Sequence, residues 1–185
     1  MVWRQYRGFA LILIVAVAVL SSPCTSLAAS AADIQRNANA ALKKLYAATP
    51  KAKELGDKAK GILVFPSVIK AGLMVGGLFG EGVLLKDGKA VAYYNTVAAS
   101  YGYQAGAQKY GYAMFLMNDK ALEYLDKSDG WEVGTGPSIV VLDQGAAGGL
   151  STTSARDDVY AFIFNQSGLM AGAGLQGSKI TKIAK

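Results

Sequence analysis

The sequence predicts an α+β domain in which amphipathic helices precede a mainly antiparallel, curved, glycine-rich sheet or a barrel-like sandwich. Two observations carry this prediction. Only one of the 22 glycines, Gly8, precedes Gly56. Before that point apolar residues recur at helical spacing, and after it short β-branched or aromatic runs are broken by glycine. With 185 residues, 52% of them hydrophobic, the chain has the length of one domain and is too apolar for a disordered segment.

The first 31 residues are typical of a secretory signal peptide. Arg4 and Arg7 precede an apolar run over residues 9–20, and small residues follow it. Twelve apolar residues are too few to span a bilayer, which takes about 20. Ala29-Ser30-Ala31 predicts cleavage before Ala32, and Ser26-Leu27-Ala28 is a competing site. We therefore expect a domain over residues 32–185, exported to the periplasm or cell envelope.

The single cysteine, Cys24, raises the alternative of a lipoprotein in which that residue is acylated and becomes the first of the processed chain. The local sequence disfavours this. Pro23 stands where processing requires a small flexible residue, and Leu20 lies four residues upstream where three is usual. We expect Cys24 to leave with the signal peptide.

Residues 33–60 form a basic helical lead. Asp33 is expected to cap a helix that runs to Ala48, and Thr49-Pro50 to begin a shorter one that closes at Gly61. This lead holds seven basic and three acidic residues, 7 − 3 = +4, whereas residues 61–185 hold ten of each. The formal charge of +6 is completed by Arg4 and Arg7. The positive charge of the processed chain is therefore localised.

Two interpretations of the lead compete. Its helices are either a lid that packs an apolar stripe on the body, or a peripheral membrane surface that attracts anionic headgroups. In the second case the headgroup contacts are basic and the shallow insertion face is apolar. The residues predicted to bind lipid are Arg36, Lys43, Lys44, Lys51, Lys53, Ile34, Leu42 and Leu45.

The body is expected to consist of short strands with one helix. Lys86-Asp87-Gly88-Lys89 carries the Asp-Gly signature of a type I′ hairpin. Asn118 is expected to cap a helix over residues 119–127, with Ala121, Leu122 and Leu125 inward. The expected strands are Ile62–Phe65, Leu73–Phe79, Gly82–Leu85, Ala90–Val97, Ser100–Gln108, Tyr112–Met117, Ser138–Leu142 and Val159–Phe164.

Composition removes most catalytic schemes. The chain has no histidine, which excludes Ser-His-Asp and Cys-His nucleophiles and His-ligated zinc, and one cysteine cannot form a thiolate metal cage. The G-x-G-x-x-G stretch at residues 172–177 has too little chain after it for a dinucleotide fold. Ser67-Val-Ile-Lys70 satisfies S-x-x-K without its usual partner motifs, so a hydrolase using Ser67 and Lys70 is a minor alternative. We expect no enzyme activity, cofactor, metal or nucleic-acid partner.

Several ordered blocks give the sequence a family resemblance. It closely resembles the SYLF domain family over residues 33–185, a match far more specific than any single glycine motif. The blocks are Ala59–Pro66, Lys70–Gly77, Gly80–Val83, Gly102–Gly106, Met117-Asn118, Gly136-Pro137, Tyr160, Ser167–Gly172 and Gly177.

The resemblance implies a non-enzymatic domain that binds membrane lipids through an N-terminal basic amphipathic helix. In eukaryotic members the lipids are phosphoinositides, and some members bind actin. Those members are cytosolic and often carry an appended module, whereas this chain begins with a predicted signal peptide. We therefore expect other anionic phospholipids as the ligand, with a structural or protein-interaction module of the envelope as the alternative function.

Overall fold

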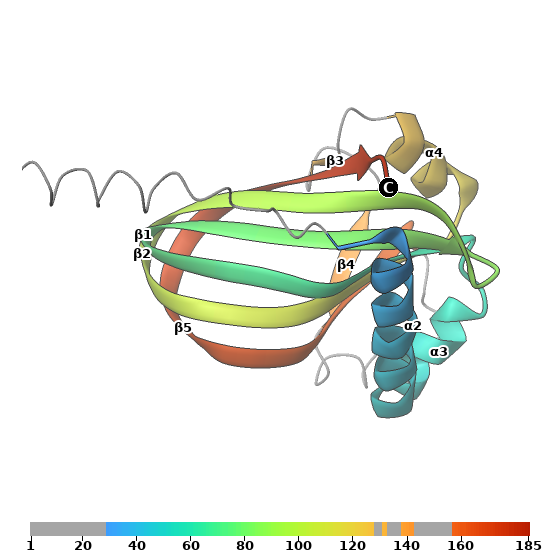
Figure 1. Ribbon diagram of the computed structural model, residues 1–185, viewed down its shortest axis with the longest axis horizontal. Coiled ribbons are helices and arrows are strands. Elements are labelled where there is room, and N and C mark those ends of the chain that lie inside the picture. The colour runs from blue at the N-terminus through green and yellow to red at the C-terminus, as the bar shows by residue number, and fades with distance from the viewer. Residues whose placement is uncertain (1–28, 128–130, 133–137, 143–156) are drawn as a thin grey trace, which may run out of the picture.

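The structure, a computed structural model, describes residues 29–127, 131–132, 138–142 and 157–185. Residues 1–28 of the predicted signal peptide, with Cys24, lie outside the described residues, whereas its last three residues are described. Helices gather at one end of the molecule, and long strands run from there to the opposite end (Figure 1). The elements are α2 (Ala31–Ala48), α3 (Pro50–Gly56), β1 (Gly61–Lys86), β2 (Lys89–Leu116), α4 (Asp119–Lys127), β3 (Trp131–Glu132), β4 (Ile139–Leu142) and β5 (Val159–Ile183).

The predicted fold class is confirmed. One curved, unclosed sheet has the strand order β1-β2-β5-β3, and all three of these pairings are antiparallel. The short strand β4 pairs with the start of β5 in parallel, from Ile139 opposite Val159 to Leu142 opposite Phe162. A mostly antiparallel sheet with its helices outside it is the α+β arrangement that the sequence indicated.

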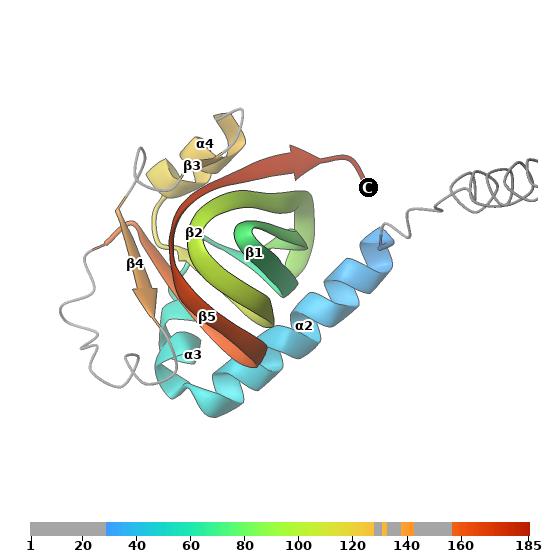
Figure 2. The same cartoon turned by 90° about the vertical axis from the view of Figure 1, so that its left-hand side faces the viewer.

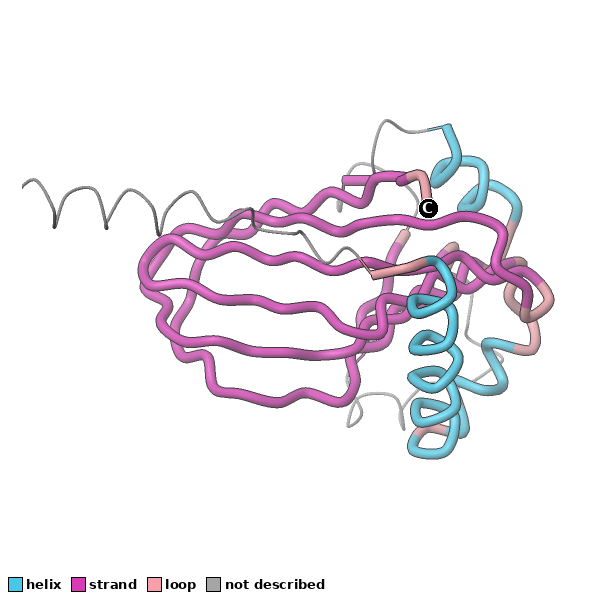
Figure 3. The backbone as a smooth tube through the Cα atoms, in the orientation of Figure 1, coloured by secondary structure: helices cyan, strands magenta, loops and turns pink. Residues whose placement is uncertain are grey.

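Each of the three long strands turns back on itself. In β1 the bend lies at Met74, whose φ is 63°, and the pairing register shifts between Leu73 and Val75. A Cβ on Gly72 would lie 2.3 Å from the Cα of Gly76, so the chain on the two sides of the bend is in contact. The tube in Figure 3 shows the strands curving round at this end. We call the bend, at Met74 and its neighbours in β2 and β5, the apex.

The prediction of separate short strands is wrong in one respect. The first three expected strands are parts of β1, the next three are parts of β2, and the last extends to Ile183. Glycine does not end these strands. Its missing side chain instead lets neighbouring segments pack closely. We call the parts of β1 before and after Met74 its outgoing and returning limbs. A Cβ on Gly82 would lie 2.5 Å from the Phe65 ring and from the Val64 carbonyl oxygen, so the absence of a side chain at Gly82 lets the two limbs of β1 pack closely against each other.

The bend divides the sheet into an inner and an outer face. Figure 2 shows β1 innermost, β2 around it and β5 outside. Between the limbs and under α4 lies one core cluster, which includes Phe65, Val68 and Leu78. A second cluster lies on the other face under α2 and α3, and includes Val64 and Val83. Near the helices both faces are covered, which explains the continuous apolar run over residues 62–65.

The predicted helices are present, and the N-cap of the first one is corrected. Ser30, not Asp33, is the N-cap of α2, since the Ser30 hydroxyl accepts a hydrogen bond from the Asp33 amide at 3.1 Å. The Ser30 hydroxyl in turn donates to the Asp33 carboxylate at 2.6 Å. The sequence signal was shifted by one turn because both residue types cap helices and Asp33 belongs to the first turn.

Three further local predictions are confirmed. Pro50 opens α3 after Thr49, although α3 ends at Gly56 rather than at Gly61. Asp87 and Gly88 both have positive φ, as the tight turn between β1 and β2 requires. Asn118 caps α4, its side-chain oxygen accepting from the Ala121 amide at 2.9 Å, and α4 faces inward through its three predicted residues.

Candidate functional site

The apolar stripe of α2 is buried against the sheet. Ile34, Leu42 and Leu45, predicted as a membrane insertion face, are at most 7% exposed and belong to the core cluster under α2. Their spacing of three and four residues puts them on one helix face, and that face meets the outer face of the sheet. In this arrangement the stripe is unavailable to lipid unless α2 first leaves the sheet.

The opposite face of α2 carries the predicted basic contacts. Arg36, Lys43 and Lys44 are exposed. Arg36 forms an ion pair with Asp33 one turn away. The Ser30 hydrogen bond, followed by this ion pair, lowers the pKa of the Asp33 carboxyl. Lys43 and Lys44 form no ion pair within the part of the chain that the structure describes.

The ion pairs of α3 use the remaining carboxylates of the lead. Lys51 pairs with Glu54 at 3.2 Å, and Lys53 with Asp57 at 2.6 Å. With the Arg36 pair, all three acidic residues of 33–60 are matched. The excess of +4 therefore resides on four lysines for which the described residues provide no ion pair, namely Lys43, Lys44, Lys58 and Lys60.

Tyr46 lies where α2 meets α3. Its hydroxyl fits against Gly56, where a Cβ would be only 2.4 Å away, and the Lys53 ammonium lies 5.9 Å from the centre of its ring. Burial, together with the nearby Asp57 carboxylate, raises the pKa of Tyr46 to about 12. Tyr46 is thus neutral across the physiological range and joins the two helices.

A hollow of about 460 Å³ opens between α2, α3 and the β1–β2 turn. Lys43 and Tyr46 line it from α2, and Asp57 and Asp87 line it from α3 and the turn. One lysine facing two carboxylates does not select an anion. The basic surface that can meet an anionic partner is therefore the outer face of the helices and not this hollow.

Contacts between distant segments fix the start of α2 on the sheet. The Ala29 amide donates to the Glu81 carboxylate at 3.2 Å. The Lys185 ammonium lies 2.7 Å from the same carboxylate and donates to the Ala29 carbonyl oxygen at 2.9 Å. Sequence reasoning missed this cluster, because a lone glutamate in β1 and a terminal lysine give no local signal that they meet.

The catalytic motifs gain no support. Ser67 and Lys70 both lie in β1, with Ser67 at the register shift between Phe65 and Val68, and not on a helix that would bring Lys70 one turn away from it. The G-x-G-x-x-G stretch lies inside β5, without the loop and helix that a dinucleotide site uses. Among the described residues, no three carboxylate or thiol side chains come together to form a metal site, and no helix there is both long and apolar enough to cross a membrane.

Comparison with known protein families gives a match. Residues 97–184 match the sequence profile of the Ysc84 family, whose description is "Las17-binding protein actin regulator". Curated protein sequences give no significant match. The profile covers the β2, α4 and β5 part of the domain, and the motif blocks of residues 59–83 precede it in the expected order. The match over residues 97–184 is consistent with a member of the SYLF domain family.

Proposed function

We propose that this protein binds anionic phospholipid surfaces peripherally, through the basic outer face of α2 and α3. One observation carries the proposal. The helices bury their apolar stripe and pair every acidic residue of the lead, which leaves four lysines, at positions 43, 44, 58 and 60, exposed and without an ion pair among the described residues. A localised excess of positive charge is what a negatively charged bilayer attracts.

The strength of such contact is modest and additive. Each basic residue at an anionic surface contributes about 1 kcal/mol, and the interaction decays within a Debye length of roughly 8 Å at physiological salt. Four lysines are enough for measurable association at low salt. The proposal assigns headgroup contact to Arg36, Lys43 and Lys44 as predicted, whereas insertion of Ile34, Leu42 and Leu45 would require the helix to detach.

Vesicle sedimentation tests the proposal. The purified protein is mixed with vesicles of neutral lipid alone or with 30 mol% acidic phospholipid (about a third of the headgroups charged). The double variant Lys43→Gln/Lys44→Gln should bind acidic vesicles about thirtyfold more weakly, corresponding to roughly 2 kcal/mol. Lys120→Gln/Lys127→Gln, which changes net charge equally on α4, is the matched control. Equal pelleting on neutral vesicles, or no difference between the two variants, would contradict the proposal.

A second candidate function is favoured by the burial of α2. Ile34, Leu42 and Leu45 pack as tightly as the core of the sheet, so the helices act as a permanent lid of a structural or protein-interaction module. In that case the wild-type protein fails to sediment with acidic vesicles. The two candidates therefore give opposite results in the same experiment.

Export is the remaining part of the proposal. The apolar run of residues 9–20 supports a cleaved signal peptide, and the contacts of the described segment favour the site after Ala28 over the site after Ala31. Cleavage after Ala31 would remove the Ser30 cap and the Ala29 contacts with Glu81 and Lys185. Cleavage after Ala28 keeps both, and converts the Ala29 amide beside Glu81 into an ammonium, which strengthens that contact.

A further inference from the structure

The outer face of the sheet continues past the helices that cover it. On the returning limb of β1, Val83 and Leu85 are buried under α2 and α3. The same face continues through Phe79, 52% exposed, to Val75, 64% exposed, because alternate residues of a strand share a face. Figure 1 shows α2 crossing the strands only near their helix end, well away from the apex. Apolar side chains on this face therefore continue beyond the part that α2 and α3 cover.

The outgoing limb and its neighbouring strands have the same character. Leu73 is 76% exposed, and it shares its face with Ile69 and Ala71. Ala71 is paired with Ala107, which in turn is paired with Leu169, 89% exposed. Directly paired residues point to the same side of a sheet. The apex thus presents exposed apolar side chains from adjacent strands, and such a patch on a small domain marks an interaction surface.

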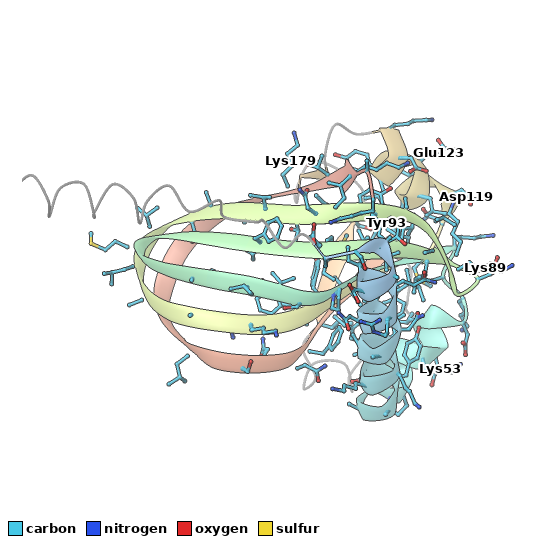
Figure 4. The ribbon with its side chains drawn as sticks, in the orientation of Figure 1. Lys53, Lys89, Tyr93, Asp119, Glu123 and Lys179 are labelled. Carbon is cyan, nitrogen blue, oxygen red and sulfur yellow. The ribbon has the colours of Figure 1, made fainter. Side chains whose placement is uncertain are left out.

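The parts of the long strands around this surface carry lysines and no carboxylates, and the short strand β3 places Glu132 opposite Lys179. Residues 65–80, 96–118 and 159–185 contain no Asp or Glu, and the parts of them nearest the apex carry Lys70, Lys109 and Lys179. In Figure 4 the labelled carboxylates, Asp119 and Glu123, lie at the helix end, whereas Lys179 projects from the sheet on the apex side of them.

Lys109 and Lys179 lie in register with positions on the two limbs of β1 that are the same number of residues from Met74. Exposed Lys109 is paired with Ile69, five residues before Met74. Exposed Lys179 is paired with Val97, which is paired with Phe79, five residues after Met74. Five strand residues span about 16 Å. An apolar tip with basic side chains behind it is complementary to a bilayer whose anionic headgroups overlie acyl chains.

Met74 adds an independent observation. It stands at the apex in the left-handed backbone region, with φ of 63° and a side chain 58% exposed. That conformation costs a residue other than glycine roughly 1–2 kcal/mol. Glycine is used freely nearby, at Gly72, Gly76 and Gly77, yet the strained position holds a large apolar side chain that supports no core. Strain retained at an exposed position indicates that the side chain has a function.

We propose that the apex is a second membrane contact, in which Leu73, Met74 and Val75 enter the interface of an anionic bilayer while Lys109 and Lys179 face its headgroups. This inference rests on the proposed function and adds the insertion element that α2 lacks. Entry is shallow, about 5–10 Å, because β1 is an edge strand whose free backbone groups cannot be satisfied among acyl chains. A second copy is disfavoured as the occupant, because two apices bring like charges together.

Three variants test the proposal by vesicle sedimentation. Leu73→Gln/Val75→Thr should weaken binding to acidic vesicles at least tenfold, since burial of each apolar side chain is worth roughly that factor. Met74→Gly removes the side chain and relieves the backbone, so it should bind several-fold more weakly without loss of thermal stability. Val91→Thr is the matched control, because Val91 is an exposed strand valine, 51% exposed, near the β1–β2 turn at the helix end. It should bind as wild type.

A fluorescent label reports insertion directly. Met74→Cys and Val91→Cys are prepared on a Cys24→Ser background, so that each protein has one thiol, and are labelled with an environment-sensitive dye. On acidic vesicles the dye at position 74 should shift to the blue and be quenched by brominated acyl chains, and the dye at position 91 should not. Neither effect is expected on the protein alone.

The outcomes separate this inference from the proposed function. If the wild-type protein binds acidic vesicles while apex variants bind equally well and the label at 74 stays in water, the apex proposal is overturned and the headgroup contact of α2 stands. If the wild-type protein does not bind acidic vesicles at all, both proposals fail. If apex variants abolish a dimer seen by sedimentation velocity without changing vesicle binding, the apex joins two copies and the lipid proposal is wrong.

Discussion

Asn118 joins the end of β2 to the start of β5 through Asp158. Its side-chain amide donates to one Asp158 carboxylate oxygen at 2.7 Å, while its own carbonyl oxygen caps α4. The other Asp158 oxygen accepts from the Ser138 amide at 3.1 Å, just before β4. One carboxylate therefore connects the N-cap of α4, the residue before β4 and the start of β5.

Replacing Asp158 with alanine should destabilise the fold. The carboxylate accepts hydrogen bonds from Asn118 and Ser138, and a hydrogen bond to a charged group contributes roughly 1.5–3 kcal/mol. Because Asp158 is partly exposed, we expect a loss of about 2 kcal/mol in the free energy of unfolding, measured in urea. Asp119→Ala, which removes an exposed carboxylate that accepts neither of these hydrogen bonds, is the control. A loss of the same size in the control would argue against the network.

The Asp158 carboxylate should also make the free energy of unfolding depend on pH in the acid range. The Asn118 hydrogen bond, followed by that of the Ser138 amide, lowers the pKa of Asp158 below its ordinary 3.8. A lowered pKa means that the stabilisation is fully present above the unfolded value and is lost as pH falls through the folded value. Unfolding curves between pH 6 and 2.5 (from above the ordinary carboxyl range to below it) should be flatter for Asp158→Asn than for wild type. Parallel curves would contradict this assignment.

The sequence predicted features that depend on residues close together in the chain, and it missed contacts between residues that are far apart in the chain. Helix periodicity located the buried stripe of α2 and the inward residues of α4, because spacing along a helix is local information. It could not tell that Gly82 lies under Phe65, since that contact forms across a bend of β1. Nor could it show that the stripe of α2 is occupied by the sheet or that Lys185 meets Ala29, 156 positions away. An amphipathic helix looks alike whether its partner is protein or lipid.

Gly82→Ala should test the close approach of the two limbs of β1. The new Cβ would lie 2.5 Å from both the Val64 carbonyl oxygen and the Phe65 ring, and the backbone oxygen cannot move aside. Overpacking of this kind costs about 1–3 kcal/mol, which thermal unfolding would report as a lower Tm. Gly77→Ala, in the same strand with nothing within 4 Å, should leave Tm unchanged or slightly higher. Equal effects would exclude the packing explanation.

The N-terminus of the exported protein should be Ala29. With residues 1–28 removed, the new ammonium lies beside Glu81, and Ser30 remains as the cap of α2. Intact mass and N-terminal sequencing of protein recovered from the envelope distinguish Ala29 from Ala32. An acylated Cys24 would appear as a larger mass and a blocked terminus. Either of those results would contradict the expectation.

Hydrogen exchange should show whether α2 leaves the sheet. Because Ile34, Leu42 and Leu45 are core residues, we expect the amides of residues 34–45 to be protected without lipid and to change little when acidic vesicles are added. Glu81→Gln removes the charge that holds Lys185 and Ala29, so it should speed exchange in the first turns of α2 and leave the later turns protected. Fast exchange throughout α2 in the free protein, with protection gained only on vesicles, would instead mean that the helix detaches to insert. The buried stripe would then be the lipid-binding face that its sequence first indicated.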